Sequence, residues 1–409
     1  MERAARERTF AWLAALAAAW LALGSLDYGS RDPDSRLYAE IAARMAEAPA
    51  AGWIAPDFPP GWFMTGRFRE HPVGVFVPAA LLAKLGYPAE QAAYAMNALY
   101  QAGTLVMLPA LAAALVPSLE ARSLGWLLQL LPIAFTYRVR ANHEQALLLC
   151  LVVALLGTER SRRRPAFALL TAAGLVGLLL VKGVFAVFGP ALCALWLLAR
   201  RREPTPPHGR QRTAWIGLAL AVVAAAAMAL LYERLYRGAT GEPFWSFYVS
   251  RQLGQATVPQ AHDAVVQKAS NAAFYLGRIL WFAFPWSLAM VAAAWPWLAA
   301  LRSPPARPGE TAVNTARAGA LFVAGTVLLY VAVFSLFDRR ADRYVFPAYY
   351  AVGAAGAVAA LLRSSRLGRL AARLDRPWVP AAVWWLAFVV HLVAGALGVP
   401  TVKIEPSRS

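Results

Sequence analysis

Long apolar runs decide what this chain can fold into. Stretches such as Phe10–Leu26, Ala214–Leu231 and Phe274–Leu301 contain few charged residues and meet the roughly 20-residue length that spans a bilayer. In lipid every backbone polar group needs an internal partner, so these runs must be helical. With 59% hydrophobic and 15% charged residues and a mean hydropathy of +0.48, the sequence predicts an all-α polytopic membrane protein.

The net charge of +18 is concentrated in short segments between the apolar runs. Together with Arg122, these segments hold 21 of the 40 Lys and Arg residues: Arg3–Arg8, Glu159–Arg164, Arg200–Arg212, Arg302–Arg317 and Arg363–Arg376. Cytoplasmic loops of membrane proteins are enriched in basic residues, so this distribution places the segments and the N-terminus in the cytoplasm. It accounts for the charge, and we expect no nucleic-acid partner.

Alternating these basic segments with the apolar runs gives about 11 transmembrane helices. Val73–Leu85 is apolar but too short to span, so an interfacial or re-entrant helix is expected there. Residues 1–409 then form one multi-pass domain of the plasma (inner) membrane, with extracytoplasmic loops at 27–72 and 237–271. The expected spans are residues 9–26, 90–116, 123–137, 143–158, 166–181, 183–199, 213–236, 274–300, 317–337, 344–362 and 378–399.

The first extracytoplasmic loop is a polar island in an apolar chain. It holds seven of the 22 acidic residues: Asp27, Asp32, Asp34, Glu40, Glu47, Asp57 and Glu70. The amphipathic stretch Leu37–Glu47 predicts an interfacial helix within the loop. An acid-rich loop at the water–lipid boundary indicates an active site on this side of the membrane.

Later segments bring cations and further acids to the same side of the membrane. They are Arg138, Arg140, His143, Glu144, Lys182, Arg251, His262, Arg343 and Tyr344. Carboxylates act as bases or metal ligands, and Arg and Lys bind phosphate. Acids and cations beside lipid fit a substrate that has a phosphate head and a lipid tail.

Several short motifs occur in a fixed order over about residues 1–360. They are Asp34-x-x-x-Tyr38-Ala39-Glu40, Met45, Gly52-Trp53-Ile54-x-Pro56, Glu70-His71-Pro72, Arg140-x-x-x-Glu144, Lys182-Gly183, Phe284-Pro285-Trp286-Ser287 and Arg343-Tyr344-x-x-Pro347. The set resembles the GT-C class of polyprenyl-phosphate-dependent glycosyltransferases. The nearest branch contains the bacterial aminoarabinose transferases of lipid A and the protein O-mannosyltransferases. The resemblance implies a GT-C-like fold with interfacial helices in the first loop.

The resemblance also implies catalytic roles for three acids. Asp34 would orient or deprotonate the acceptor, and the alternative is a helix N-cap. Glu70 would help to bind the donor or a divalent metal, and the alternative is a loop ion pair with Arg67 or Arg69. Independently of the resemblance, His143 and His262 are candidate metal ligands beside Glu70, against the alternative of ordinary polar loop residues. Glu144 would be a second external acid, against the alternative of an acid solvated at a helix start. A divalent metal is therefore a candidate cofactor.

For the donor phosphate, the resemblance implies Arg140, Lys182 and Arg343 as ligands. The family usually has a lysine where this chain has His71, so the chain departs from the pattern there, and Arg69 is the candidate replacement. A cation such as Lys182 in an apolar run is a functional candidate by default, although its side chain can also snorkel to the interface.

Two tyrosines complete the candidate site. Tyr38 lies one helical turn after Asp34 and would face the same side, with an interfacial aromatic anchor as the alternative. Tyr344 follows Arg343 directly, and both tyrosines are candidate substrate-binding residues.

The predicted function is transfer of a sugar from a polyprenyl-phosphate donor to an extracytoplasmic acceptor, which would be a lipid, a glycan or a protein. Two other classes remain open. One is a flippase or transporter of lipid-linked saccharides, which would carry polar residues along a mid-membrane path. The other is an O-antigen ligase-like enzyme, which would also use external arginines.

Overall fold

The structure is a computed structural model of the full chain. It describes residues 33–62, 64–116, 121–137, 140–201, 210–256, 264–293, 311–337 and 340–364, with isolated positions between 367 and 389. The expected span 9–26 lies outside the described residues, and so does most of the expected span 378–399.

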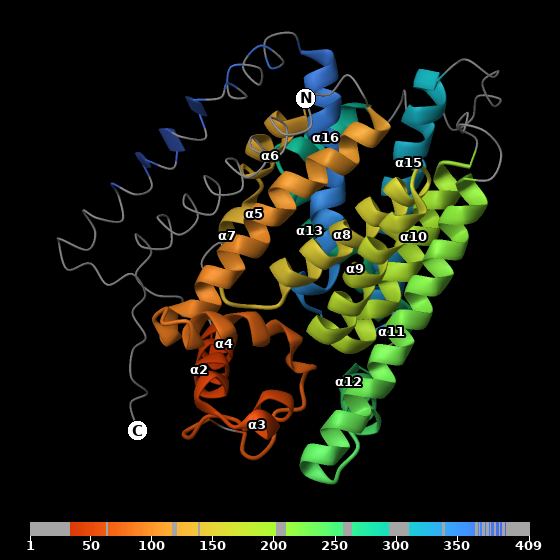
Figure 1. The fold of residues 1–409 in the computed structure, drawn as a ribbon. Coiled ribbons are helices and arrows are strands. Elements are labelled where there is room, and N and C mark those ends of the chain that lie inside the picture. The colour runs from red at the N-terminus through yellow and green to blue at the C-terminus, as the bar shows by residue number, and fades with distance from the viewer. Residues whose placement is uncertain are drawn as a thin grey trace.

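The described part is helical, which confirms the predicted all-α class (Figure 1). It contains no strand, and its β-type pairing is an isolated bridge between Asp57 and Arg67. The α-helices are α2 (Pro33–Glu47), α3 (Ala50–Ile54), α4 (Val77–Lys84), α5 (Ala89–Leu115), α6 (Ala121–Leu128), α7 (Pro132–Thr136), α8 (Glu144–Ser161), α9 (Ala168–Lys182), α10 (Phe188–Ala199), α11 (Arg210–Thr240), α12 (Trp245–Ala256), α13 (Ala264–Phe282), α15 (Thr311–Ser335) and α16 (Phe346–Arg363). Four 3₁₀ segments are η1 (Val73–Val75), η2 (Pro165–Phe167), η3 (Gly183–Val187) and η4 (Asp342–Val345).

Five helical segments of the described part are long and apolar enough to cross a membrane, and a bent pair would make a sixth. The five are Gln91–Leu115, Pro165–Ala199, Gln211–Thr240, Arg317–Ser335 and Asp342–Arg363. This composition confirms a multi-pass helical membrane protein. The predicted total of about 11 spans is not confirmed.

Two expected spans are interrupted at prolines. The expected helix 123–137 is split into α6 and α7, and α7 begins at Pro132. In the region of the expected helix 274–300, α13 begins earlier, at Ala264, and ends at Phe282. A second helical segment, Trp286–Ala293, follows at an angle of 110° to the first. Pro132 and Pro285 lack the N–H that a continuing helix needs, so single straight spans were wrong predictions at both places.

The expected break between residues 181 and 183 is present. Gly183 has a φ of 55°, in the region that glycine adopts without the steric cost of a Cβ atom. Beyond it, the chain packs back on itself: a Cβ atom on Gly189 would lie 2.6 Å from Leu178 and 2.7 Å from Leu175. The break therefore leaves Lys182 as the last residue of α9, at the end of an apolar helix.

Close packing fixes α8 against α9. A Cβ atom on Gly174 of α9 would lie 2.5 Å from the backbone nitrogen of Ala154 and 2.6 Å from the carbonyl oxygen of Cys150, both in α8. Small residues allow such close approach of helix backbones in lipid. The pair carries Glu144 at the start of α8 and Lys182 at the end of α9, so their distance is set by this contact.

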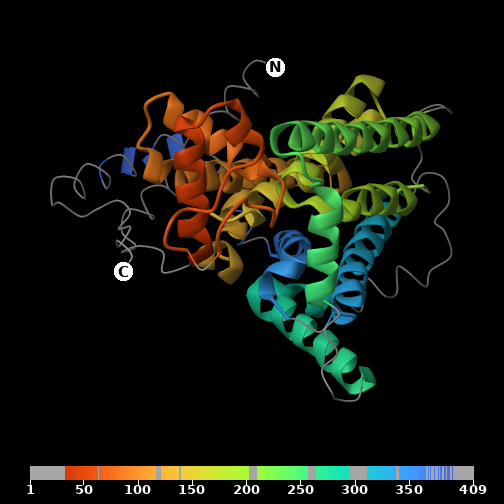
Figure 2. The same cartoon turned by 90° about the horizontal axis from the view of Figure 1, so that it is seen from below.

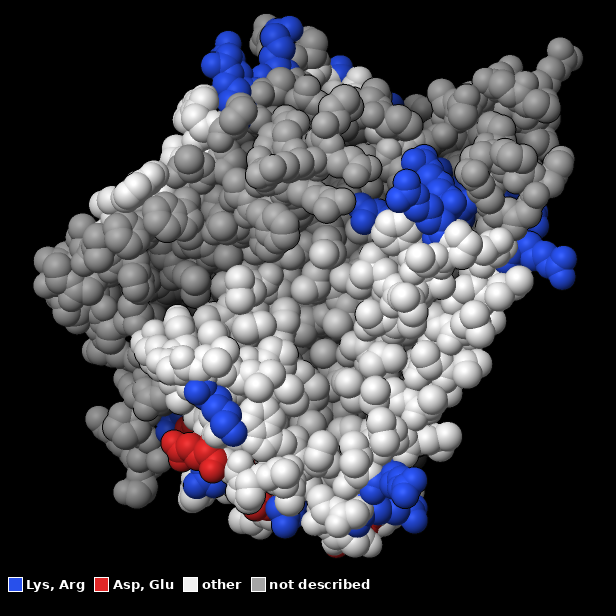
Figure 3. Space-filling view, viewed as in Figure 1, with Lys and Arg blue, Asp and Glu red and all other residues white. Residues whose placement is uncertain are grey.

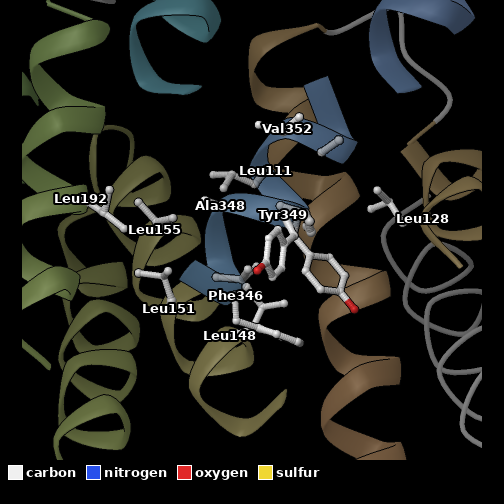
Figure 4. Packing of buried hydrophobic residues seen from close by; sticks show 14 of the residues in the cluster. Leu111, Leu128, Leu148, Leu151, Leu155, Leu192, Phe346, Ala348, Tyr349 and Val352 are labelled. Carbon is white, nitrogen blue, oxygen red and sulfur yellow. The ribbon is translucent and has the colours of Figure 1, made fainter. Parts of the chain in front are cut away.

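The main core lies among α5, α6, α8, α10, α13, α15 and α16. Figure 4 shows part of it, where Leu111 of α5 and Leu151 of α8 point toward the side chains of Phe346 and Tyr349 of α16. Phe346 and Tyr349 are fully buried. The core thus holds the start of α16, and with it η4, against α8.

The first loop is an ordered layer with its own core. Leu37, Tyr38, Ile41 and Met45 on one side of α2 are buried in a second cluster that also includes residues of α4, α11 and α12. Figures 1 and 2 show α2, α3, α4 and α12 at the same end of the helical bundle. The predicted interfacial helices of the loop are α2 and α3, and Val73–Lys84 is the expected short apolar helix.

Charged residues divide between the two ends of the molecule. On the face shown in Figure 3, the acidic residues lie at the lower end, near the first loop, together with several Lys and Arg, and further groups of Lys and Arg without acidic neighbours lie at the upper end. The ends of α8 and α16 carry Arg160 and Arg363. This division agrees with the segments that the sequence analysis assigned to opposite sides of the membrane.

Candidate active site

The first turn of α2 is joined to two later parts of the chain. Asp34 forms an ion pair with Arg343 of η4. The Ser35 hydroxyl donates to Oδ1 of Asn142 at 2.7 Å and accepts from the backbone N–H of Ala141 at 3.0 Å. These contacts close sequence separations of more than 100 residues. They bring the acid of the first loop to the start of α8 and to η4.

A chain of buried polar side chains continues from this point. The Tyr38 hydroxyl lies 3.1 Å from Nδ1 of His143, whose Nε2 lies 2.5 Å from Nζ of Lys182. Nζ of Lys182 is also 3.5 Å from Nε2 of His71. Each of the four residues is less than one tenth exposed. Two imidazoles therefore contact the buried Lys182 nitrogen, and one of them also contacts the Tyr38 phenol.

Glu144 faces this cluster from the first residue of α8. It is 2% exposed, and its Oε1 lies 3.1 Å from Nε2 of His143. This contact lacks hydrogen-bond geometry, so within the described residues both carboxylate oxygens have no hydrogen-bond partner. The helix N-terminus and the nearby cations Lys182 and Arg343 supply the compensating positive potential.

Burial determines the charge states around the ammonium. It raises the pKa of Tyr38 well above the usual value, and the negative charge of Glu144 acts in the same direction. Burial also lowers the pKa of His71 well below its usual value, with the positive charge of Lys182 as the next cause. At neutral pH, Tyr38 is thus a phenol and His71 a neutral imidazole.

A small cavity opens beside the cluster. Its polar lining comes from His143, Glu144, Lys182 and Arg343. The remaining lining is mostly apolar or aromatic: Leu147, Leu151, Leu178, Phe185, Phe188, Gly189, Tyr330, Tyr344, Phe346 and Pro347. The cavity therefore joins a cationic and acidic wall to an apolar wall built from α8, α9, α10, α15 and α16.

No protein-family model matches the sequence, and no curated protein matches it significantly. Solved structures do match. The chain superposes on ArnT from Cupriavidus metallidurans bound to undecaprenyl phosphate with a TM-score of 0.62 and 17% sequence identity, over 96% of its own length. The chain has the GT-C fold. It spans 65% of the length of that ArnT chain. The apo structure of the same ArnT gives a TM-score of 0.57 at 16% identity, with coverage of 95% and 64%.

Within the GT-C fold, six predicted site residues line the cavity or lie in the polar chain beside it. They are Tyr38, His71, Glu144, Lys182, Arg343 and Tyr344. Asp34 is joined to them through Arg343 and is 45% exposed at its side chain. The sequence-based grouping of these side chains is therefore present as a spatial cluster at the first-loop end of the fold.

Arg69 and Glu70 lie in contacts with the second loop. Arg69 forms an ion pair with Glu242, and its guanidinium lies over the Phe247 ring, 4.7 Å from the centroid. Oε1 of Glu70 accepts from Arg251 at 2.8 Å. Arg69 therefore does not fill the place of the missing family lysine, since Lys182 is the cation beside His71. The two pairs hold the first loop onto the segment around α12.

The other predicted residues lie apart or outside the described part. The Arg140 guanidinium lies over the Tyr137 ring, 4.4 Å from its centroid, and Arg140 is not among the residues that line the cavity. His262 falls outside the described residues. Across the part of the chain that is described, no group of three or more His, Cys, Asp or Glu side chains is arranged to hold a metal ion.

The sequence analysis assigned no site role to Asn142 or Ser35 and considered His143 only as a metal ligand, although all three contribute to the cluster. One signal was available: Asn142 and His143 directly precede Glu144, so a helix start at Glu144 places them at the same membrane face. Their pairing with Ser35 and Tyr38 depends on how α2 packs, which sequence spacing does not reveal.

Proposed function

We propose that the protein is a membrane glycosyltransferase that moves a sugar from a polyprenyl-phosphate donor to an extracytoplasmic acceptor. The observation that carries this proposal is the two-sided cavity, where Lys182 and Arg343 lie on one wall with His143 and Glu144, and the opposite wall is mostly apolar or aromatic. A phosphate attached to an isoprenoid tail fits both walls: the charged phosphate fits the cations, and the apolar tail fits the apolar wall. The shared fold with an ArnT structure bound to undecaprenyl phosphate supports a lipid phosphate as the ligand.

Lys182 and Arg343 would stabilise the phosphate as a leaving group. Both lie in a site from which the surrounding helices exclude most water, where charge–charge attraction is stronger than in solution. The reaction would form a bond between the acceptor oxygen or nitrogen and the anomeric carbon. The bond from that carbon to the phosphate oxygen would break, and its electron pair would pass to the phosphate. Fixed positive charges that face the developing negative charge lower the barrier to such a step.

Asp34 would take the proton of the acceptor. In the present structure its carboxylate is paired with Arg343. A donor phosphate that binds Arg343 would compete for that guanidinium and release the carboxylate to act as a base. Since Asp34 is half exposed, an acceptor arriving from the aqueous side can reach it.

A divalent metal remains a candidate cofactor, with Glu70 as one ligand. Among the described residues, the carboxylate of Glu70 faces Arg251 and is not accompanied by a second metal ligand. The steps above are therefore written with the cations of the chain, and no step is assigned to a metal.

The location of the site follows from the charge distribution. We infer that the N-terminus is cytoplasmic and that the cavity opens on the extracytoplasmic side of the plasma (inner) membrane. The acceptor would then be an envelope lipid, glycan or protein.

The test compares cell-envelope glycans with and without the protein by mass spectrometry, which identifies the transferred sugar. Transfer is then measured in membranes with the corresponding polyprenyl-phosphate sugar. Asp34→Asn and Arg343→Ala are each expected to lower the transfer rate about 100-fold or more, because each removes a group that acts on the reacting atoms.

Arg237→Ala is the matched control. This arginine is also ion-paired, with Glu233 at 2.6 Å, but is 60% exposed and belongs to α11, so its loss should leave transfer unchanged. Full transfer by both site variants would contradict the assignment of the site. Movement of the lipid-linked sugar across the membrane without transfer would instead favour a flippase.

A further inference from the structure

His143 stands between two groups of the proposed site. Its Nδ1 lies 3.1 Å from the Tyr38 hydroxyl and its Nε2 lies 2.5 Å from Nζ of Lys182. The imidazole is 3% exposed, so water does not compete for either nitrogen. We infer that His143 is a positioning residue that holds the Lys182 ammonium and aims the Tyr38 hydroxyl hydrogen at the substrate. This inference rests on the proposed function.

The hydrogens of the three side chains can be assigned by counting donors and acceptors. An ammonium group only donates, so Nε2 of His143 must accept from Lys182. A neutral imidazole then carries its hydrogen on Nδ1. This N–H donates to the Tyr38 oxygen, which acts as the acceptor. The order of donation therefore runs from Lys182 through His143 to Tyr38.

The contact with Glu144 does not reverse this order. A protonated His143 would donate from Nε2 to Glu144, whose Oε1 lies 3.1 Å away. That contact lacks hydrogen-bond geometry, whereas the shorter contact, at 2.5 Å, is with Lys182. Two cations side by side in a buried site would also repel each other strongly. The geometry thus selects the neutral imidazole as the acceptor of the Lys182 hydrogen.

This order leaves the hydroxyl hydrogen of Tyr38 available. Within the described residues, His143 is the hydrogen-bond partner that the Tyr38 hydroxyl has. If Tyr38 accepts from His143, its own hydrogen must donate to a group that enters the site. Since Tyr38 follows Asp34 by one turn of α2, that hydrogen is offered beside the carboxylate proposed to receive the acceptor proton.

Lys182 is oriented in the same way. Nε2 of His71 lies 3.5 Å from its ammonium, so the two imidazoles occupy two of its three N–H donors. Its backbone is fixed as well, because the Tyr248 hydroxyl donates to its carbonyl oxygen at 2.8 Å. The third N–H is left for a phosphate in the cavity that Lys182 lines. Removing His143 frees the ammonium to turn away from that position.

The experiment measures sugar transfer and binding of undecaprenyl phosphate for His143→Ala, His143→Gln and Tyr38→Phe, together with the double variant Tyr38→Phe/His143→Ala. His143→Ala is expected to lower kcat about 100-fold, as for other displacements of reacting groups. Because His143 acts on the reaction through Tyr38, the double variant should be no slower than His143→Ala alone. Glutamine keeps a hydrogen-bond acceptor for Lys182, so His143→Gln should bind the lipid phosphate more tightly than His143→Ala. Its kcat should stay as low as that of His143→Ala.

Thr158→Val is the control for loss of a buried hydrogen bond in the same helix. Its hydroxyl donates to the carbonyl of Ala154 at 2.8 Å, far along α8 from the cavity, so transfer should stay unchanged. Thermal melting confirms that each variant is folded. Multiplicative losses in the double variant, or a lowered melting temperature in His143→Ala with kcat unchanged, would overturn the inference.

The two proposals fail in different ways. If the wild-type protein transfers no sugar from any polyprenyl donor, the proposed function is wrong. Binding of undecaprenyl phosphate then tests His143 alone. A loss of binding in His143→Ala that His143→Gln restores supports the positioning role, and equal binding by all three proteins overturns it.

Discussion

At the scale of single residues, the cation beside His71 is Lys182, which is 111 positions away in the sequence. The resemblance to the GT-C class led us to expect a lysine at the position of His71, and Arg69, the candidate replacement, is ion-paired with Glu242. The ammonium of Lys182, from the end of α9, lies 3.5 Å from the imidazole of His71. The cation beside His71 therefore comes from the end of a distant helix and not from a neighbour in the sequence.

The neutral state of His71 predicts how stability depends on pH. Burial lowers the pKa of His71 in the folded protein, so the unfolded chain, with its usual value of about 6.5, binds the proton more tightly. The stabilising contribution is full above that value and is lost as the pH falls toward the lowered pKa of the folded state. The melting temperature in detergent should therefore fall between about pH 7.5 and about pH 5.5.

The variant His71→Gln isolates this effect, since glutamine does not titrate. Its melting temperature should fall less than that of the wild type over the same pH interval. Equal slopes for the two proteins would show that His71 does not bind its proton more weakly in the folded state.

At the scale of helices, the site depends on where each element ends. Lys182 is the last residue of α9 and Glu144 the first residue of α8, so two helix ends present a cation and an acid to one cavity. The spacing between them is set by the close contact of these helices near Gly174. The packing of α8 against α9 thus fixes the distance between Glu144 and Lys182 in the site.

Replacing Gly174 should disturb this arrangement. Its added Cβ would meet backbone atoms of α8 at 2.5 and 2.6 Å, and the helices would have to separate. Gly174→Ala is expected to lower the free energy of unfolding by about 1–3 kcal/mol, as for overpacked cores, and to reduce transfer as well. Thermal or denaturant unfolding in detergent gives the first quantity.

Gly277→Ala serves as the comparison, because a Cβ there would meet no heavy atom within 4 Å. That substitution in α13 should leave stability unchanged or raise it slightly, owing to the better helix propensity of alanine. Similar losses in both variants would mean that close approach of α8 and α9 is not the cause.

At the scale of the whole molecule, the two ends of the bundle have different electrostatics. The cavity end combines acids with cations. At the opposite end of α8, Glu159 is buried between Arg162 and Arg200, at 3.2 and 2.9 Å, and accepts from the indole of Trp196 at 2.9 Å. Basic residues surround this end, as expected for the cytoplasmic side.

Cysteine labelling tests this orientation. In a variant with Cys150 and Cys193 replaced by alanine, Ser250→Cys on α12 should react with a membrane-impermeant maleimide added to intact cells. Arg163→Cys, after α8, should react only once the membrane is permeabilised. Both positions are exposed, so access is limited by the membrane alone. The reverse pattern would place the cavity on the cytoplasmic side.

The class of fold followed from the sequence, whereas two of the interruptions in its helices did not. Apolar runs of spanning length require helices in lipid, and the break at Lys182-Gly183 was visible as polar residues within an apolar run. The split at Pro132 was missed because the expected helix was placed from its apolar length alone. The turn after Phe282 was missed for the same reason.

For the candidate site, the types of residue that gather were predictable, but their partners were not. Lys182 was singled out because a cation within an apolar run is costly, whereas Asp34, Glu144 and Arg343 were singled out by the resemblance to the GT-C class. His143 was considered only as a metal ligand, because spacing along the chain did not reveal its contacts with Tyr38 and Lys182.

The sequence by itself determined a helical membrane protein with acids and cations on one side, since hydropathy and charge distribution act over whole segments. Only the tertiary structure decided that Asp34 pairs with Arg343, that Lys182 lies between two imidazoles, and that Arg69 is turned away. These pairings join residues up to 309 positions apart. They depend on helix packing over distances of a few ångströms, which no local pattern of residues encodes.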